Sequence, residues 1–434
     1  MRMIRVNLMV SLVLLLSASA AGQGAERISD HSVAPSPWRQ LAKLTEAHGH
    51  IQDWLGWSVA ISKDGNTAAV GAVNWCATEG NGCGQGAIFV FVKPASGWAD
   101  MTQTAMLTAS DGQPGEYLGE SVAISDDGST IIAGAPLWPA DGSFDGAAFV
   151  FVRPRQGWRS GHETALLTST DGRNVSLGQS VGISGGTAIA GGFGYNGSQG
   201  AVYVFSQPKD GWTNMSQTAR LTPSDGTDAD MGWSVGIEGG TVVAGSPFTG
   251  TGDAGNGVYV FLKPKQGWRN RTETGKLTAS RGAGFRLGYS VSISSTMIAV
   301  GAPYRSNDNG AIYVYVKPTD GWRSMTETAR LSVLPKSNLL GYSVAAYNQG
   351  KNIAAGDPGW RDGGGQGAAV LFTKPLTGWE TTSRFKARLA AGDGINGDGL
   401  GFSTAAASSG IVAGAPYAMI GSNRQQGAVY VFGR

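Results

Sequence analysis

The stretch Leu287-Gly288-Tyr289-Ser290-Val291 begins a pattern that continues through Val300-Gly301-Ala302-Pro303 to the segment 310–315, Gly-Ala-Ile-Tyr-Val-Tyr. These segments are rich in β-branched and aromatic residues and are bounded by glycine or proline, which indicates short buried strands separated by turns. A fourth segment, typified by Ala219-Arg220-Leu221-Thr222, alternates apolar and polar residues as a half-buried strand does. The pattern therefore predicts a unit of four short strands.

This unit recurs along the chain, because the motif Leu-Gly-x-Ser-Val or a close variant is found seven times. Successive motif glycines are 53 to 63 residues apart, which is long enough for four short strands and their turns. The Gly/Ser pairs of the motif are Gly56/Ser58, Gly119/Ser121, Gly178/Ser180, Gly232/Ser234, Gly288/Ser290, Gly341/Ser343 and Gly401/Ser403.

The repeat is out of phase at the two ends of the chain. The first strand-like segment, Leu41-Ala42-Lys43-Leu44-Thr45, corresponds to the fourth strand of a unit, whereas the last, 428–432, corresponds to the third. A closed ring gains from pairing these two segments, because closure leaves no long open strand edge. We predict an all-β fold, a seven-bladed β-propeller with four-stranded blades over residues 38–434, closed by the N-terminal strand pairing onto the last blade.

The N-terminal region has the order of a cleavable secretion signal. Basic residues are followed by an apolar run from Leu8 to Leu16 and by small residues up to Ala21. We therefore expect a signal peptide over residues 1–21 and a linker over residues 22–37. No later stretch has the roughly 18 apolar residues of a transmembrane helix. We expect a monomer that is secreted and is extracellular or at the cell surface, with the periplasm as an alternative.

Two cysteines, Cys76 and Cys83, lie close together in one segment. An oxidising compartment outside the cell favours joining them. We predict a disulfide that rigidifies this loop more than it stabilises the fold, since the closed loop is small.

The repeats resemble the FG-GAP repeat of integrin α-subunit propellers, and more closely its bacterial variety, on residues such as 287–292 and 300–303. The resemblance implies a seven-bladed propeller used for adhesion or ligand binding, and integrin propellers hold their partner subunit with aromatic residues on one face. The calcium loops of integrin blades are absent. Turns such as 62–66 and 125–129 offer too few oxygens for Ca²⁺, and 393–399 reads as an ordinary turn between blades. We expect no metal and no cofactor.

Two segments, 178–182 and 232–236, match the Gly-x-Ser-x-Gly nucleophile elbow of serine hydrolases. The same serine recurs in all seven repeats as part of a strand, which contradicts a single nucleophile. Histidine is scarce, with His31, His48, His50 and His162 the only four in the sequence. We therefore expect no catalytic residues and no enzymatic activity, with a hydrolase as the least favoured alternative.

The charges exclude one class of partner. The chain has 33 basic and 31 acidic residues, and the basic ones are scattered singly rather than in a stripe. A stripe of Lys and Arg is typical of proteins that follow a phosphate backbone. We expect no binding to nucleic acid.

Aromatic residues follow the Gly-Ala-Pro segment in every repeat, where the loop between the second and third strands begins. Such rings could stack on a sugar or grip a partner's side chain, or could pack between adjacent blades. The pattern favours packing, but both interpretations stay open, and a protein or glycan ligand is the expected partner. A lectin-like propeller with repeated sites is the alternative. The candidate ligand-binding residues are Trp75, Trp138, Phe193, Tyr195, Phe248, Tyr304, Trp360 and Tyr417.

Overall fold

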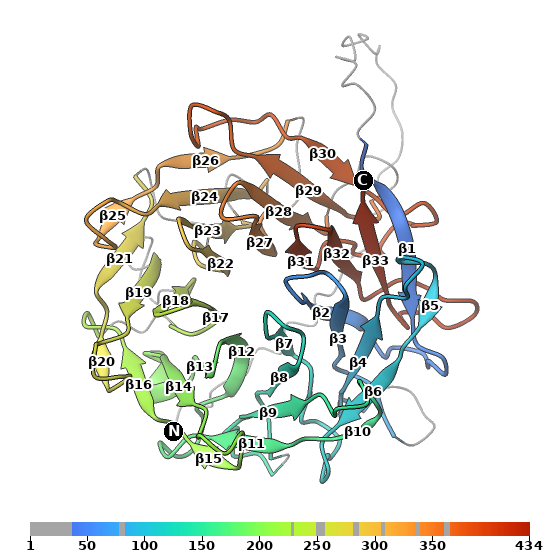
Figure 1. Ribbon diagram of the computed structural model, residues 1–434, viewed down its shortest axis with the longest axis horizontal. Coiled ribbons are helices and arrows are strands. Elements are labelled where there is room, and N and C mark those ends of the chain that lie inside the picture. Colours follow the sequence, from blue (N-terminus) through green and yellow to red (C-terminus); the bar gives the residue numbers. More distant parts are fainter. Residues whose placement is uncertain are drawn as a thin grey trace, which may run out of the picture. The chain divides into compact units, whose positions relative to one another are not determined.

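The computed structural model describes residues 37–77, 83–139, 141–226, 230–248, 257–280, 286–304, 309–334, 339–359 and 365–434. These residues form seven β-sheets arranged as the blades of a propeller (Figure 1), so the predicted fold is confirmed. They contain one short helical turn, α1 (Tyr195–Ser198). The predicted signal peptide, residues 1–21, and the linker up to residue 36 lie outside the described residues.

Each blade has an inner strand near the axis, two middle strands and an outer strand, in antiparallel order. Blade 1 contains β2 (Leu55–Ile61), β3 (Thr67–Ala72), β4 (Ala87–Val92) and β6 (Ala105–Thr108). Blade 2 contains β7 (Ser121–Ile124), β8 (Thr130–Ala135), β9 (Ala147–Val152) and β11 (Ala165–Thr168). Blade 3 contains β12 (Leu177–Ser184), β13 (Thr187–Gly192), β14 (Ala201–Ser206) and β16 (Ala219–Thr222).

The remaining blades follow the same plan. Blade 4 contains β17 (Ser234–Glu238), β18 (Thr241–Ser246), β19 (Gly257–Leu262) and β21 (Gly275–Thr278). Blade 5 contains β22 (Ser290–Ser294), β23 (Met297–Ala302), β24 (Ala311–Val316) and β26 (Ala329–Leu331). Blade 6 contains β27 (Val344–Tyr347), β28 (Asn352–Asp357), β29 (Ala368–Thr373) and β30 (Ala387–Leu389). Blade 7 contains β31 (Ser403–Ala407), β32 (Gly410–Ala415), β33 (Ala428–Gly433) and β1 (Arg39–Thr45).

Blade 7 combines the two ends of the propeller, because β1 is its outer strand. It pairs antiparallel with β33, with Lys43 opposite Tyr430 and Leu44 opposite Val429 (Figure 1). Its other edge is covered by β5 (Met101–Thr102), which belongs to the next blade.

A fifth strand in most sheets was not expected from the sequence. In five of the seven sheets, the outer strand pairs in parallel with a two-residue strand donated by the following blade. These donated strands are β5, β10 (Gly161–His162), β15 (Met215–Ser216), β20 (Arg271–Thr272) and β25 (Met325–Thr326). A polar side chain beside each also binds the outer strand, as where Asn270 Oδ1 accepts the Arg220 N–H at 2.8 Å. Four strands per blade is therefore the contribution of each repeat, and the donated strand links it to its neighbour.

The hydrophobic cores lie between blades rather than within them. The seven buried clusters each combine residues of two neighbouring blades, such as Ala299 and Val314 of blade 5 with Ile353 and Val370 of blade 6. The middle strands are therefore apolar on both faces, and β3 and β8 are buried at every residue. A blade without its neighbours would expose both of its apolar faces to water.

Near the axis, each motif serine bonds to the next blade. Ser290 Oγ donates to the carbonyl of Gly341 at 2.8 Å, and the same contact occurs at all seven blade boundaries, including Ser403 to Gly56 at 2.7 Å. The other five pairs are Ser58 with Gly119, Ser121 with Gly178, Ser180 with Gly232, Ser234 with Gly288 and Ser343 with Gly401. The serine of the apparent nucleophile elbow thus has a structural partner.

Glycine is required on both sides of this contact. A Cβ on Gly134, in the Gly-Ala-Pro segment of blade 2, would lie 1.8 Å from the carbonyl oxygen of Gly178 in blade 3. Gly178 itself has a φ of +93°, a conformation that other residues rarely adopt. The two glycines of the repeat therefore let adjacent backbones touch.

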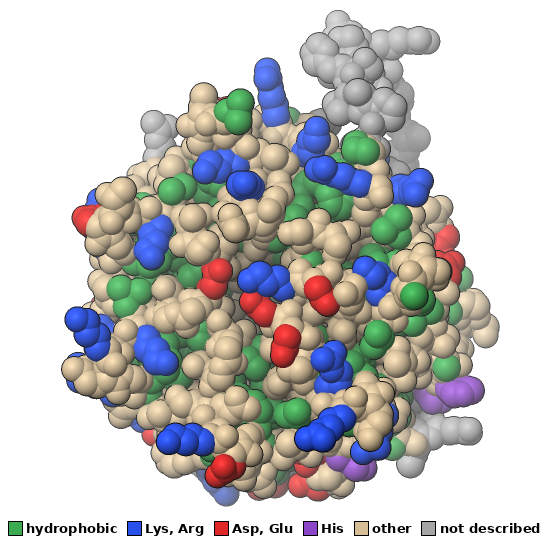
Figure 2. All heavy atoms as spheres, in the orientation of Figure 1, with side chains coloured by type: hydrophobic (Ala, Val, Ile, Leu, Met, Phe, Trp, Pro, Cys, Tyr) green, Lys and Arg blue, Asp and Glu red, His purple; other side chains and the backbone are tan. Residues whose placement is uncertain are grey.

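The propeller has two different faces. The loops between second and third strands and the connections between blades lie on one face, which we call the aromatic face. The hairpins between first and second strands and the loops between third and outer strands lie on the other, which we call the hairpin face. Figure 2 looks onto the hairpin face.

We predict that Ser290→Ala lowers the free energy of unfolding by about 1 to 3 kcal/mol, because the buried carbonyl of Gly341 loses its donor. Denaturant unfolding followed by tryptophan fluorescence measures this change. Ser96→Ala, in an exposed turn, is the matched control and should unfold like the wild type. Equal midpoints for the two variants would contradict a stabilising role for the contact.

Candidate functional site

Seven side chains converge at the axis, one at or just before the start of each inner strand. Each occupies the variable position of Leu-Gly-x-Ser, between the glycine and the serine that join adjacent blades. We call this set the plug, and it consists of Trp57, Glu120, Gln179, Trp233, Tyr289, Tyr342 and Phe402. All seven are partly exposed.

Aromatic rings make most of the plug and contact one another around the axis. The ring centroids of Trp57 and Phe402 are 4.6 Å apart, those of Phe402 and Tyr342 4.8 Å, and those of Tyr342 and Tyr289 5.0 Å. Trp233 continues the series at 5.9 Å from Tyr289. Tilted contacts of this kind are favourable beyond the apolar area that they bury.

A hydrogen-bonded pair occupies the rest of the plug. Gln179 Nε2 donates to Glu120 Oε1 at 3.2 Å, and the indole of Trp57 also bonds to Glu120. Burial among these rings raises the pKa of Glu120 to about 7, although both hydrogen bonds favour the carboxylate. The plug therefore contains one carboxyl group that changes its charge near neutral pH.

A second layer of rings lies on the plug and comes from the loops between second and third strands. Phe248 contacts Trp233 with a centroid separation of 4.8 Å, Tyr304 contacts Tyr289 at 5.8 Å, and Tyr417 contacts Phe402 at 5.9 Å. Phe193 contacts Trp233 at 5.7 Å. Four of the eight predicted ligand-binding residues are thus brought together around the plug.

An arginine is already stacked in this layer. The guanidinium carbon of Arg286 lies 4.7 Å from the ring centroid of Phe248 and 4.3 Å from that of Tyr304. Both distances are within the range of a cation–π interaction. These two loops therefore present a slot that fits a planar cation.

The other predicted residues lie elsewhere. Trp75 is only 9% exposed and packs in the core between blades 7 and 1, and Trp138 packs against the core between blades 1 and 2. Tyr195 contacts Tyr203 and stacks with Arg220 of blade 3. Trp360 lies outside the described residues. Cys76 and Cys83 form a disulfide, as predicted.

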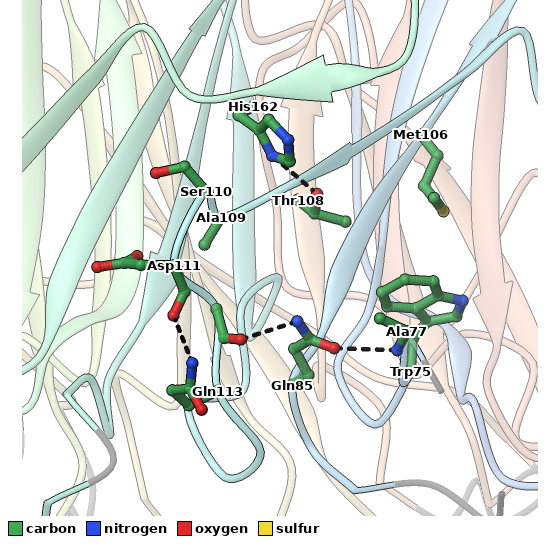
Figure 3. A pocket seen from close by; sticks show the side chains of 11 residues that line it. Trp75, Ala77, Gln85, Met106, Thr108, Ala109, Ser110, Asp111, Gln113 and His162 are labelled. Atoms are coloured by element: carbon green, nitrogen blue, oxygen red, sulfur yellow. Dashed lines mark hydrogen bonds between the residues drawn. The ribbon is translucent and has the colours of Figure 1, made fainter. Parts of the chain in front are cut away.

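Trp75 borders an open depression of about 520 Å³ between blades 1 and 2 (Figure 3). Its wall combines apolar and polar groups, and Gln85 is held there because it donates to the Gly112 carbonyl at 3.0 Å and accepts the Ala77 N–H at 3.0 Å. His162 enters from blade 2 and bonds to Thr108 at 3.2 Å. A second depression of about 430 Å³, bordered by Trp138, shares Asp111 and Gln113 with the first.

Acidic residues predominate on the aromatic face. Three of the acidic residues pair with cations of the outer strands, namely Asp171 with Arg220, Asp225 with Lys276 and Asp393 with Lys43. In the part of the chain that the structure describes, the acidic residues of these loops and connections are Glu46, Asp53, Asp111, Glu116, Glu120, Asp141, Asp145, Asp171, Asp225, Asp230, Asp357, Asp393 and Asp398. The basic ones there are Arg173, Arg286 and Arg424.

One carboxyl pair on this face is buried. Glu46 is 5% exposed and Asp53 is 1% exposed, in the connection that leads from β1 to β2. Burial, followed by the nearby Asp53 charge, raises the pKa of Glu46 to about 9. Five of the six equivalent positions in the other blades are apolar, for example Ala109 and Ala279, and the sixth is Ser169. Glu46 is thus protonated in the folded protein at neutral pH.

Within the described ranges, no three His, Cys, Asp or Glu side chains are grouped so as to hold a metal ion. No helix in those ranges has the length and apolar character needed to cross a membrane.

Comparison with known protein families matches the FG-GAP repeat at residues 38–91, 101–151, 215–261, 271–315 and 384–432. No curated protein matches the chain.

We predict that Glu46→Ala stabilises the protein increasingly as the pH rises from about 5 to 8. The pKa of Glu46 is raised to about 9 in the folded state from 4.5, so the unfolded state binds fewer protons over this range and the wild type loses stability with rising pH. The variant removes this loss, which is roughly 1.4 kcal/mol per pH unit.

Denaturant unfolding at both pH values measures the effect, with Glu380→Ala as an exposed control. If the difference in the free energy of unfolding between Glu46→Ala and the wild type were the same at pH 5 and pH 8, the prediction would be wrong.

Proposed function

Because the chain belongs to the FG-GAP repeat family, we propose that it is a non-enzymatic binding propeller, secreted or displayed at a cell surface, that holds a protein partner against its aromatic face. The fold supports a binding role only in general terms, since one fold serves many functions. The argument for the partner's chemistry comes from the plug and the loops around it.

The stacked guanidinium of Arg286 is the observation that carries the proposal. It shows that rings of this layer, Phe248 and Tyr304, accept a cation at 4.7 and 4.3 Å. The same face has exposed carboxylates, such as Asp111 and Asp141, which attract a positively charged partner over a longer range. We infer that a Lys or Arg side chain of the partner is held over the plug, next to Glu120.

Two further observations support a binding protein outside the cell rather than an enzyme. The motif serines donate their hydroxyls to glycine carbonyls of the next blade, as Ser180 does to Gly232 at 2.7 Å, so they have a structural role. The disulfide between Cys76 and Cys83 is typical of an oxidising compartment, in agreement with the predicted signal peptide.

We predict that the mature protein retains arginine-containing peptides on an array better than the same peptides with citrulline, which has the same shape without the charge. Retention should be stronger at pH 8 than at pH 5.5. The reason is that the pKa of Glu120 is raised to about 7, so its carboxylate forms mainly at the higher pH. A single cation–π or charge contact supports a difference of roughly 3- to 30-fold.

Glu120→Gln should abolish the difference between the two pH values, and Asp141→Asn, an exposed carboxylate on the same face, should leave it unchanged. Equal retention of arginine and citrulline peptides would overturn the proposed cationic partner. Loss of the pH difference in both variants would remove the role of Glu120.

A glycan is the second candidate ligand, and the depression beside Trp75 favours it. An aromatic ring bordered by amide, hydroxyl and imidazole groups is a common surface for neutral sugars, and Gln113, Thr108 and His162 provide those groups here (Figure 3).

We predict that any glycan bound by the mature protein on a glycan array is lost in Gln113→Ala and His162→Ala, with or without calcium. Trp75→Ala is unsuitable, because the ring is 9% exposed and its removal would create a cavity. Gln199→Ala, on another blade, is the control. Retained binding in both variants would place the glycan elsewhere.

A further inference from the structure

The six loops between third and outer strands repeat one short sequence, in which a first residue is followed by Pro-x-x-Gly-Trp. The first residue is basic in five of the six loops, namely Lys93, Arg153, Lys263, Lys317 and Lys374. In the sixth, Gln207 takes this place and Lys209 follows two residues later. The repeat therefore places at least one basic residue in the same loop, between the third and outer strands, of six blades.

These loops are held rigidly against the hairpins of the hairpin face. In each, the turn glycine donates to the proline carbonyl, as Gly267 does to Pro264 at 3.0 Å. The first residue donates its backbone N–H to a hairpin carbonyl, as Lys263 does to Gly240 at 2.7 Å. The tryptophan is buried in five of the six loops. In blade 2, Trp158 Nε1 also donates a hydrogen bond to the Gly128 carbonyl at 3.2 Å. Loops of equal length and equal bonding place their tips at one height.

The rim of the hairpin face is consequently basic. Figure 2 shows Lys and Arg side chains spread around this rim, while acidic side chains gather mainly near the axis. The Gly-Trp loops of blades 2 and 4, residues 152–160 and 262–270, contain three basic residues each and no acidic residue. Elsewhere on the rim, Asp320 pairs with Arg323, and Asp100, Asp210 and Glu380 are the other acidic residues near these loops.

The acidic residues near the axis are engaged locally. Asp126 pairs with Lys63 at 3.0 Å across two hairpins. Asp64 accepts hydrogen bonds from Ser62 and Asn66 of its own hairpin. Asp127 is bound in the same way by Ser125 and Ser129, and Glu238 lies near Lys63. Hydrogen bonds do not neutralise Asp64 and Asp127, so the negative charge of this face lies near the axis and the positive charge lies at the rim.

The rim also presents apolar side chains among its cations. Leu376 is fully exposed at the tip of the blade-6 loop, two residues after Lys374, and Val152 is 39% exposed next to Arg153. An apolar side chain next to basic residues is typical of protein surfaces that enter the headgroup region of a bilayer. The two depressions described above lie at the blade connections of the opposite face and not at the rim.

We propose that the rim of the hairpin face docks on a lipid bilayer that carries anionic headgroups, with Leu376 entering the headgroup region. A ring of cations at one height matches a planar array of negative charges, whereas a single linear polyanion would be better served by a groove. Docking in this orientation directs the aromatic face away from the bilayer, where it is free to hold a partner.

Co-sedimentation of the mature protein with vesicles tests the proposal. Phosphatidylcholine vesicles that contain phosphatidylglycerol should bind the protein, with an affinity that falls as salt is added, and pure phosphatidylcholine vesicles should not. The variant Lys263→Gln/Lys265→Gln/Arg269→Gln should reduce the partition coefficient by roughly 100-fold, since each basic residue near an anionic surface contributes about 5-fold. Arg173→Gln/Arg330→Gln/Arg424→Gln removes the same charge away from the rim, with Arg330 inside the outer strand β26, and should bind like the wild type.

Two further measurements separate the bilayer from other polyanions. Leu376→Ser should weaken vesicle binding and leave binding to dextran sulfate, a soluble linear polyanion, unchanged. Equal loss in the rim variant and its control would overturn the proposal, because net charge alone would then explain the binding. Binding to dextran sulfate without binding to vesicles would also overturn it and would assign the rim to anionic polysaccharide.

Discussion

The hydrogen bond from a motif serine to a glycine carbonyl of the next blade is the contact on which the ring depends. Because every hydrophobic core is shared by two blades, adjacent sheets must approach closely before any core is complete. The Ser290 and Gly341 pair, repeated at each boundary, sets that approach at the axis. The donated two-residue strands do the same at the circumference in five sheets. At five of the seven blade boundaries, adjacent blades are thereby joined both near the axis and at the circumference.

This constraint also produces the candidate site. Glycine and serine of Leu-Gly-x-Ser are committed to the neighbouring blade, so the residue between them is brought to the axis in all seven blades. Its identity is free of the packing rules that govern its neighbours, and the chain uses that freedom for rings in five blades and for Gln179 and Glu120 in the other two. A position that looks variable in the repeat is therefore the one available for binding.

The regular repeat explains why the fold could be predicted from the sequence. The glycine and serine of the motif and the apolar strands recur because every blade needs them to pack against its neighbours. Their spacing in the sequence therefore predicts the number and size of the blades. The site was predicted only in part. Loops after the second strand differ in length between blades, so equivalent aromatic residues reach different places. Phe248 and Tyr304 contact the plug, whereas Trp75 packs in the core between blades 7 and 1. Nothing in the linear order shows that Trp57 and Phe402, 345 positions apart, are in contact.

Charge shows the same difference between sequence and structure. Lys and Arg are scattered singly along the chain, and from this we expected no stripe of basic residues for nucleic acid. Successive loops of a blade lie on opposite faces, however. The loops between second and third strands and the blade connections are rich in acidic residues, whereas the loops between third and outer strands are rich in basic residues, so the two kinds of charge lie on different faces. The separation depends on the topology and is invisible in the net charge of +2.

The pairing of β1 with β33 also bears on how the protein reaches its native state. Lys43 and Tyr430 lie opposite each other although 387 positions separate them in the sequence. β1 must therefore wait for β33, so the seventh blade has no complete sheet until the rest of the propeller has been synthesised. Contacts of such long sequence separation form slowly. During this interval β1 and the unfinished blade both expose free strand edges, which makes the nascent chain a natural client for factors that shield such edges from aggregation.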